Sequence, residues 1–166
     1  MKPPSNWAHL RDILILPGMV CVVIPYLLNN IPNAIIPHSG LIRQAGAVVF
    51  IIGLVLWAYP VFLFRTIGMG TLAPWAPTQK LIVTGPYLYC RNPMITGILF
   101  ILAGEGLWLW SLPILAWATW FFIMNTLYFR FLEEPGLVKR FGDDYIRYRQ
   151  NVPMWIPRLK PYRLQK

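Results

Sequence analysis

The sequence predicts an all-α integral membrane protein with about four transmembrane helices, a C-terminal helical hairpin and a cytoplasmic helical tail. Three observations support this prediction: the composition, the long apolar runs and the placement of the basic residues. Of the 166 residues, 57 % are apolar and only 13 % are charged, whereas about 25 % are charged in an average globular domain. So few charges cannot cover the surface of a soluble domain of this size. The composition therefore indicates a membrane protein and excludes disordered, collagen-like and coiled-coil chains.

Four apolar runs are the predicted membrane spans: residues 13–28, 45–64, 93–110 and 112–129. A span needs about 20 residues, so the short first run must recruit flanking residues to cross a bilayer. A signal peptide is the alternative for this run. No small-residue cleavage site follows it, so a retained helix is favoured. Only Ser111 separates the last two runs, which predicts a tight antiparallel helical hairpin.

The basic residues predict the orientation. Four spans place both termini on the same side of the membrane. That side carries fourteen of the fifteen Lys and Arg residues, and only Arg43 falls on the other. Because cytoplasmic loops carry an excess of Lys and Arg, we expect both termini, the middle loop (65–92) and the tail (130–166) to be cytoplasmic. The chain is expected to form one domain, 1–166, with an N-terminal helical pair (1–64) and a second part (65–166) that holds the middle loop, hairpin and tail.

The placement of the charges argues against nucleic-acid binding, and the cysteine and histidine contents argue against a disulfide framework and a metal site. The net charge is +9, and much of it lies in the tail that follows the hydrophobic hairpin. A basic tail in this place is typical of a surface that faces membrane lipids rather than nucleic acid. Cys21 and Cys90 lie far apart, and His9 and His38 are the only histidines. The sequence therefore predicts neither a disulfide framework nor a metal site.

Polar residues flank the hairpin at both of its cytoplasmic ends. Arg91 and Asn92 precede the third run, with a proline directly after them, and Arg130, Glu133 and Glu134 follow the fourth. Antiparallel packing would bring the two clusters to the same membrane level, where they could hold a zwitterionic, adenine-bearing molecule. The simpler alternatives are a helix start capped by Asn92 and local ion pairs from Arg130 to the acids three and four residues later.

Two longer motifs carry a family resemblance. The stretch before the hairpin reads LIVTGPYLYCRNPMITG, and the tail contains EEPGLVKRFGDDYIRYRQNVPMWIPR. Together they resemble the isoprenylcysteine carboxyl methyltransferase family, which is related to the membrane phospholipid methyltransferases. The resemblance covers about residues 79–157. It implies an integral membrane enzyme that uses S-adenosylmethionine without a Rossmann domain and methylates a lipid or a lipid-modified acceptor.

The resemblance also implies the residues of the site. In the family, the loop before the hairpin and the first hairpin helix bind the cofactor. The matching positions, with Arg91 added from the polar cluster, are Gln79, Lys80, Leu81, Ile82, Tyr87, Arg91, Asn92, Pro93, Met94 and Ile95. Glu133 matches the family's cofactor-contacting acid. Arg130 is the nearest counterpart of its substrate-side arginine, offset by about one position.

The chain departs from the family pattern at two positions. Asn92 replaces the usual His, and Ile95 replaces the usual Tyr, so an aromatic contact to the cofactor is either missing or supplied by Tyr87 or Tyr89. Neither change removes a group that methyl transfer needs. A carboxylate acceptor requires no base and could be oriented by Arg130. With an amine or hydroxyl acceptor, an acid of the Glu133–Glu134 pair would take the proton.

Two other functions stay open on the sequence. Sterol reductases have a similar-looking C-terminal hairpin and tail, so an NADPH-dependent membrane reductase is one alternative. The other is a non-catalytic membrane scaffold that keeps the fold. Binding of S-adenosylmethionine, of NADPH or of neither cofactor distinguishes the three functions.

Overall fold

The structure of the chain is a computed structural model that describes residues 7, 11, 15, 17–31, 39–63, 66–67 and 80–163. Within these ranges every regular element is a helix and no strand occurs, which confirms the all-helical prediction for this part of the chain. In chain order the elements are η1 (Met19–Val23), α2 (Ile24–Asn29), α3 (Gly40–Leu63), η3 (Gly85–Leu88), α4 (Pro93–Trp108), α5 (Leu112–Tyr128), η4 (Phe129–Glu133), α6 (Glu134–Phe141) and α7 (Asp143–Asn151).

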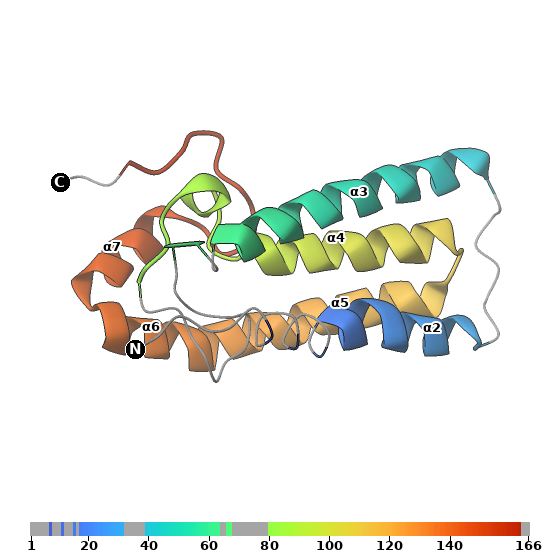
Figure 1. Ribbon diagram of the computed structural model, residues 1–166, viewed down its shortest axis with the longest axis horizontal. Coiled ribbons are helices and arrows are strands. Elements are labelled where there is room, and N and C mark those ends of the chain that lie inside the picture. The colour runs from blue at the N-terminus through green and yellow to red at the C-terminus, as the bar shows by residue number, and fades with distance from the viewer. Residues whose placement is uncertain are drawn as a thin grey trace.

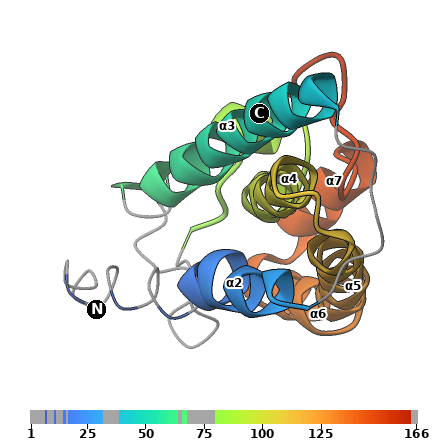
Figure 2. The ribbon, with the colours of Figure 1, turned by 90° about the vertical axis from the view of Figure 1, so that its right-hand side faces the viewer.

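The long helices α3, α4 and α5 run along the longest axis of the molecule, with α4 between the other two (Figures 1 and 2). Helix α2 lies beside α5, and η1 reaches α4. Helices α6 and α7 gather at the end of the molecule where α4 begins (Figure 1). The polar loop before α4 and the acidic pair after α5 therefore lie at the same end of the helical bundle.

Among the described residues, two helices are long and apolar enough to cross a membrane. They are α3, with 24 residues, and the continuous helix Leu112–Phe141 of 30 residues, which α5, η4 and α6 form together. The other two predicted spans correspond to shorter apolar helices, Met19–Asn29 and Pro93–Trp108. At 1.5 Å per residue, such helices are shorter than the hydrocarbon core of about 30 Å. The count of four spans therefore stays a prediction.

The hairpin forms at the expected place, but its second helix does not end at residue 129, where the fourth predicted span ends. The chain turns over residues 109–111, where Trp110 has a φ of 56°, and Pro113 lies in the first turn of α5. The backbone stays helical past Arg130 through the π-helical turn η4 and ends only at Phe141. Pro135 has no N–H to complete an α-helical hydrogen bond, and the wider π turn directly before it accommodates this loss.

Glycines bring α3 and α4 into backbone contact. Gly46 on α3 faces Gly104 on α4, and Gly53 on α3 faces Gly97 on α4. The two glycines within each helix are seven residues apart. A Cβ atom at Gly53 would lie only 2.6 Å from the amide nitrogen of Ile101. Small residues at such crossings let two membrane helices approach closely and gain van der Waals contact. This seam, which sequence analysis did not identify, fixes the start of α4 against the end of α3.

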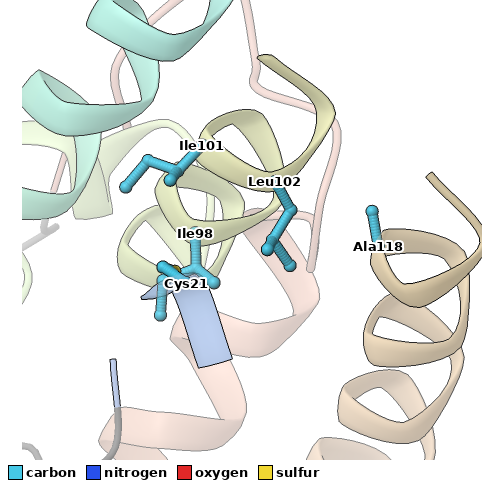
Figure 3. Close-up of a cluster of buried hydrophobic side chains, with 5 residues drawn as sticks. All are labelled: Cys21, Ile98, Ile101, Leu102 and Ala118. Carbon is cyan, nitrogen blue, oxygen red and sulfur yellow. The ribbon is translucent and has the colours of Figure 1, made fainter. Parts of the chain in front are cut away.

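Helix α4 supplies the centre of the main apolar core. Ile98, Ile101 and Leu102 on α4 pack with Cys21 on η1 and Ala118 on α5 (Figure 3). The indole N–H of Trp117 on α5 also donates to the backbone carbonyl of Val20, at 3.2 Å. The core thus holds η1, α4 and α5 together below the polar end of the molecule.

Candidate active site

The loop before α4 rests on the end of α3. Gly85 has a φ of 56°, and a Cβ atom there would lie 2.9 Å from the ring of Tyr59. The side chain of Tyr87 is buried in a cluster with Leu63 and Ile82. Gly85 thus allows both the left-handed backbone conformation and the close approach to Tyr59. These contacts place the loop at the level where α3 ends.

The segment after α7 lies over this loop, and we call residues 152–163 the C-terminal strap. The backbone N–H of Arg91 donates to the carbonyl of Pro153, at 2.9 Å. The N–H groups of Arg158 and Tyr162 donate to the carbonyls of Tyr89 and Leu88, at 3.0 and 2.9 Å. The strap thus satisfies backbone groups of the loop that no regular secondary structure would pair.

Glu134 is the buried member of the acidic pair. One of its carboxylate oxygens accepts a hydrogen bond from the guanidinium of Arg91, and the other lies 3.6 Å from the guanidinium of Arg149 on α7. Only 9 % of the Glu134 side chain is exposed. This carboxylate therefore joins the loop, the end of the long helix and α7, and two cations compensate its charge.

Glu133 lies in a more open environment. Its Oε2 atom accepts a hydrogen bond from the Tyr128 hydroxyl at 3.3 Å, and its Oε1 atom lies 3.5 Å from the guanidinium of Arg140. The side chain of Glu133 is 30 % exposed. Of the two acids, Glu133 is the one that a bound molecule can reach without displacing a buried ion pair.

Helix α7 carries two buried tyrosines, and one of them, Tyr145, interacts with Arg91 and Glu134. Tyr145 and Tyr148 pack with Val152 in one apolar cluster, and the Tyr148 hydroxyl donates to the backbone carbonyl of Tyr87 at 2.6 Å. Burial raises the pKa of Tyr145, and the negative charge of Glu134 raises it further, while Arg91 lowers it. Burial is also the main cause of the raised pKa of Tyr148. Both phenols therefore stay neutral at physiological pH, and Tyr148 acts as a hydrogen-bond donor to the loop.

The model of the family described as "Phospholipid methyltransferase" matches residues 41–144, well over half of the chain. The chain belongs to this family. The match begins in α3, which precedes the predicted motifs, and includes the loop, the hairpin and the acidic pair. It confirms the resemblance drawn from the two motifs and indicates a methyltransferase that acts on lipids. A comparison with curated proteins found no match.

Some of the predicted cofactor residues are buried in packing contacts, and the others are exposed or partly buried at the surface. Most of the apolar ones serve packing: Leu81 lies against the tyrosine cluster, Ile82 and Tyr87 are buried with Leu63, Pro93 is fully buried and Ile95 packs on the core. Lys80 is exposed, whereas Arg91, Asn92 and Met94 are partly buried at the entrance of α4. Gln79 lies outside the described residues. Of the two candidate aromatic contacts, Tyr87 is buried and Tyr89 is exposed.

Asn92 and Arg130 do not make the local interactions that were the simpler alternatives to a binding site. Asn92 occupies the N-cap position of α4, but its side chain makes no capping hydrogen bond. It donates instead to the backbone carbonyl of Met154 in the strap, at 3.5 Å. The local ion pairs expected for Arg130 do not form either, because Arg91, Arg149 and Arg140 hold the two acids. Arg130 is exposed beside them.

Sequence analysis missed three polar residues of the site: Tyr128, Arg140 and Arg149. A signal for one of them exists in the tail. Tyr145, Tyr148 and Val152 are spaced three and four residues apart, which is the period of a helix with one buried face. That period predicts helix α7 and the face on which it is buried. Arg149 directly follows Tyr148, so the same period places it beside this buried face. The strap carried no such signal, since its contacts are made by backbone groups.

Proposed function

We propose that the chain is an integral membrane methyltransferase that uses S-adenosylmethionine to methylate a lipid or a lipid-modified acceptor at the cytoplasmic membrane face. The observation that supports this most is the meeting of the loop before α4 with the acidic pair after α5, within the part that matches the lipid methyltransferase family. The basic residues of the loop and the tail favour the cytoplasmic face.

The residues of the site suit a zwitterionic cofactor that contains a nucleoside. Glu133 offers a partly exposed carboxylate to an ammonium group or to the ribose hydroxyls. The exposed ring of Tyr89 offers an aromatic surface, and exposed Lys80 offers a cation for the carboxylate of the cofactor. When bound, S-adenosylmethionine supplies a methyl group that is activated by the sulfonium charge. Neither acid is then needed to activate the donor.

The acceptor is proposed to enter sideways from the cytoplasmic leaflet. Arg130 is exposed where the long helix leaves its apolar part, and Phe131 and Leu132 beside it are also exposed. An amphiphile can place its chain along these apolar side chains and its head at Arg130. Arg130 would orient an anionic head group, and Glu133 would take the proton from an amine or a hydroxyl. Positioning and exclusion of water can supply most of the rate enhancement for such a displacement.

Cofactor binding tests this proposal. Isothermal titration calorimetry of the purified protein in nanodiscs should show binding of S-adenosylmethionine, and Glu133→Gln should weaken it more than tenfold. A charge-assisted hydrogen bond contributes about 1.5–3 kcal/mol, which corresponds to at least that loss. Glu105→Gln is the matched control, since Glu105 lies on α4 far from Glu133 in sequence and near the opposite end of the hairpin. Binding of NADPH instead would support a reductase, and binding of neither would support a scaffold.

The length of the acceptor chain tests lateral entry. Methyl transfer should be assayed in liposomes with acceptors that share a head group and differ in the length of the apolar chain. Each buried methylene adds about 0.8 kcal/mol of favourable transfer, so the efficiency should rise with chain length up to the depth of a leaflet. Equal efficiency for short, soluble acceptors would contradict entry from the membrane.

A further inference from the structure

Two apolar side chains of the C-terminal strap are held out into the surroundings. Leu159 is 100 % exposed and Ile156 is 80 % exposed. Single exposed apolar residues are common on protein surfaces. These two lie three residues apart in a segment without helix or strand, where a flexible chain could turn them inward.

The backbone of the strap is fixed on both sides of Leu159. The N–H groups of Arg158 and Tyr162 are bound by the loop carbonyls described above. The ring of Tyr162 also packs against Tyr148, with 6.0 Å between the ring centroids. Pro157 and Pro161 further restrict the backbone by locking φ. The exposure of Leu159 is thus a consequence of the way the strap is attached.

The attachment places the strap beside the end of a membrane-spanning helix. The strap lies on the loop, and the loop lies on Tyr59 and Leu63 in the last turns of α3. Large apolar side chains of α3 near this end are exposed, among them Tyr59 and Phe62. In both views the segment after α7 bends outward beyond the helices (Figures 1 and 2). The exposed Ile156 and Leu159 belong to this segment.

The charges of the strap indicate the partner. Residues 152–163 contain Arg158, Lys160 and Arg163 and no acid, and both Lys160 and Arg163 are exposed. Apolar side chains that alternate with cations suit the boundary between acyl chains and anionic head groups. A second copy of this basic segment would meet it with like charge, which disfavours self-association through the strap.

We propose that the strap is an interfacial membrane anchor. Ile156 and Leu159 insert into the head-group region of the leaflet next to α3, while Lys160 and Arg163 contact anionic lipid phosphates. The bilayer then holds the strap over the loop that precedes α4. This inference rests on the membrane placement that is part of the proposed function, and it goes beyond that function by assigning the strap a lipid contact of its own.

Fluorescence quenching by lipids tests the anchor. Three single variants, Leu159→Cys, Val55→Cys and Asp144→Cys, carry an environment-sensitive label in nanodiscs that contain spin-labelled phospholipid. Val55 is exposed in the middle of α3, and Asp144 is exposed on α7. The native Cys21 and Cys90 are buried, and the labelled parent protein measures their background. The label at position 159 should lose emission as the one at 55 does, with a blue shift, while the label at 144 should not.

The outcomes separate the two proposals. Quenching at 55 but not at 159 overturns the anchor and leaves the membrane placement intact, whereas no quenching at 55 overturns the placement itself. The double variant Lys160→Gln/Arg163→Gln should reduce quenching at 159 in nanodiscs with anionic lipid but not in purely zwitterionic ones. A blue shift at 159 that depends on protein concentration, without quenching by lipid, would indicate a second copy of the chain and would overturn the anchor.

Discussion

The two adjacent acids of the tail have different environments in spite of their identical chemistry. Glu134 is buried between Arg91 and Arg149, whereas Glu133 is partly exposed and held by Tyr128 and Arg140. A buried carboxylate that joins three segments is suited to positioning, because removing it leaves cations uncompensated. We therefore assign Glu134 to the support of the loop and keep Glu133 as the proposed ligand contact.

Glu134→Gln should destabilise the protein by about 3 kcal/mol, because loss of one partner leaves the Arg91 guanidinium buried without its counter-charge. The free energy of unfolding measured by denaturant titration in micelles gives the value. Glu133→Gln is the neighbouring control and should cost about 1 kcal/mol or less, as expected for a partly exposed pair. The double variant Arg91→Leu/Glu134→Leu should recover part of the loss. Equal costs for the two single variants would contradict the division of roles.

The helices α3 and α4 are joined by glycines, and this seam determines where the loop begins. The four glycines Gly46, Gly53, Gly97 and Gly104 each leave no space for a methyl group. Close backbone contact along the whole seam fixes the rotation of α4, and with it the direction in which Arg91 and Asn92 lead into the loop. A change in the seam is therefore expected to affect the site as well as the stability.

Gly53→Ala should destabilise the protein by about 1–3 kcal/mol, the range typical of an overpacked interior. The added methyl group would lie 2.6 Å from the amide nitrogen of Ile101 and 2.8 Å from the carbonyl oxygen of Gly97, and backbone cannot yield as a side chain can. Thermal unfolding followed by circular dichroism gives the change. Gly136→Ala in α6 is the matched control, since nothing lies within 4 Å of its Cβ position. It should be neutral or slightly stabilising, because alanine favours a helix over glycine.

At the scale of the molecule, the polar end and the apolar bundle are separate units that meet at the loop. The apolar core of η1, α4 and α5 lies along the bundle, and the tyrosine cluster of α7 forms a second core at its polar end. Several acidic groups of this end, including Cys90, Tyr145 and Tyr148, are kept neutral by burial, which raises the pKa of each. The stability of the end of the molecule that carries the site should therefore decrease at alkaline pH.

The stability should be constant from neutral pH to about pH 8.5 and fall above it. The folded state keeps protons that the unfolded chain releases near pH 8.5 for cysteine and near pH 10 for tyrosine, to use approximate ordinary values. A raised folded-state pKa thus contributes stability below the unfolded value, and this is lost as the pH rises toward the folded value. Melting temperatures between pH 7 and 11 measure the effect. Cys90→Ala should delay the decline toward pH 10, and a decline unchanged by this variant would contradict the role of Cys90.

The orientation of the whole chain is a separate prediction. Both ends of the chain and residues 65–92 should face the cytoplasm, because fourteen of the fifteen basic residues lie on that side of the predicted spans. Arg147→Cys on exposed α7 should react with an impermeant thiol reagent only in inside-out vesicles. Ser39→Cys, directly before α3, should react only in right-side-out vesicles. Reaction of position 147 from outside would reverse the orientation and place the site on the other face.

The sequence by itself determined the helical class, the hairpin and the family. Long apolar runs leave a helix as the way to satisfy backbone groups in lipid, and Pro93 and Pro113 marked the helix starts that the structure shows. The two motifs carried enough residue identities for the family. These features depend on neighbours along the chain, so local patterns are sufficient to predict them.

Only the tertiary structure decided how the acidic pair is used and what covers the loop. Arg91 and Glu134 are 43 residues apart, and no local rule selects Glu134 over Glu133 or Arg91 over the nearer Arg130. That choice follows from the rotation of the long helix through its π turn and from the arrival of α7 with Arg149. The strap is held by backbone hydrogen bonds between distant segments, and backbone groups are the same at every residue, so side-chain patterns do not reveal such pairing.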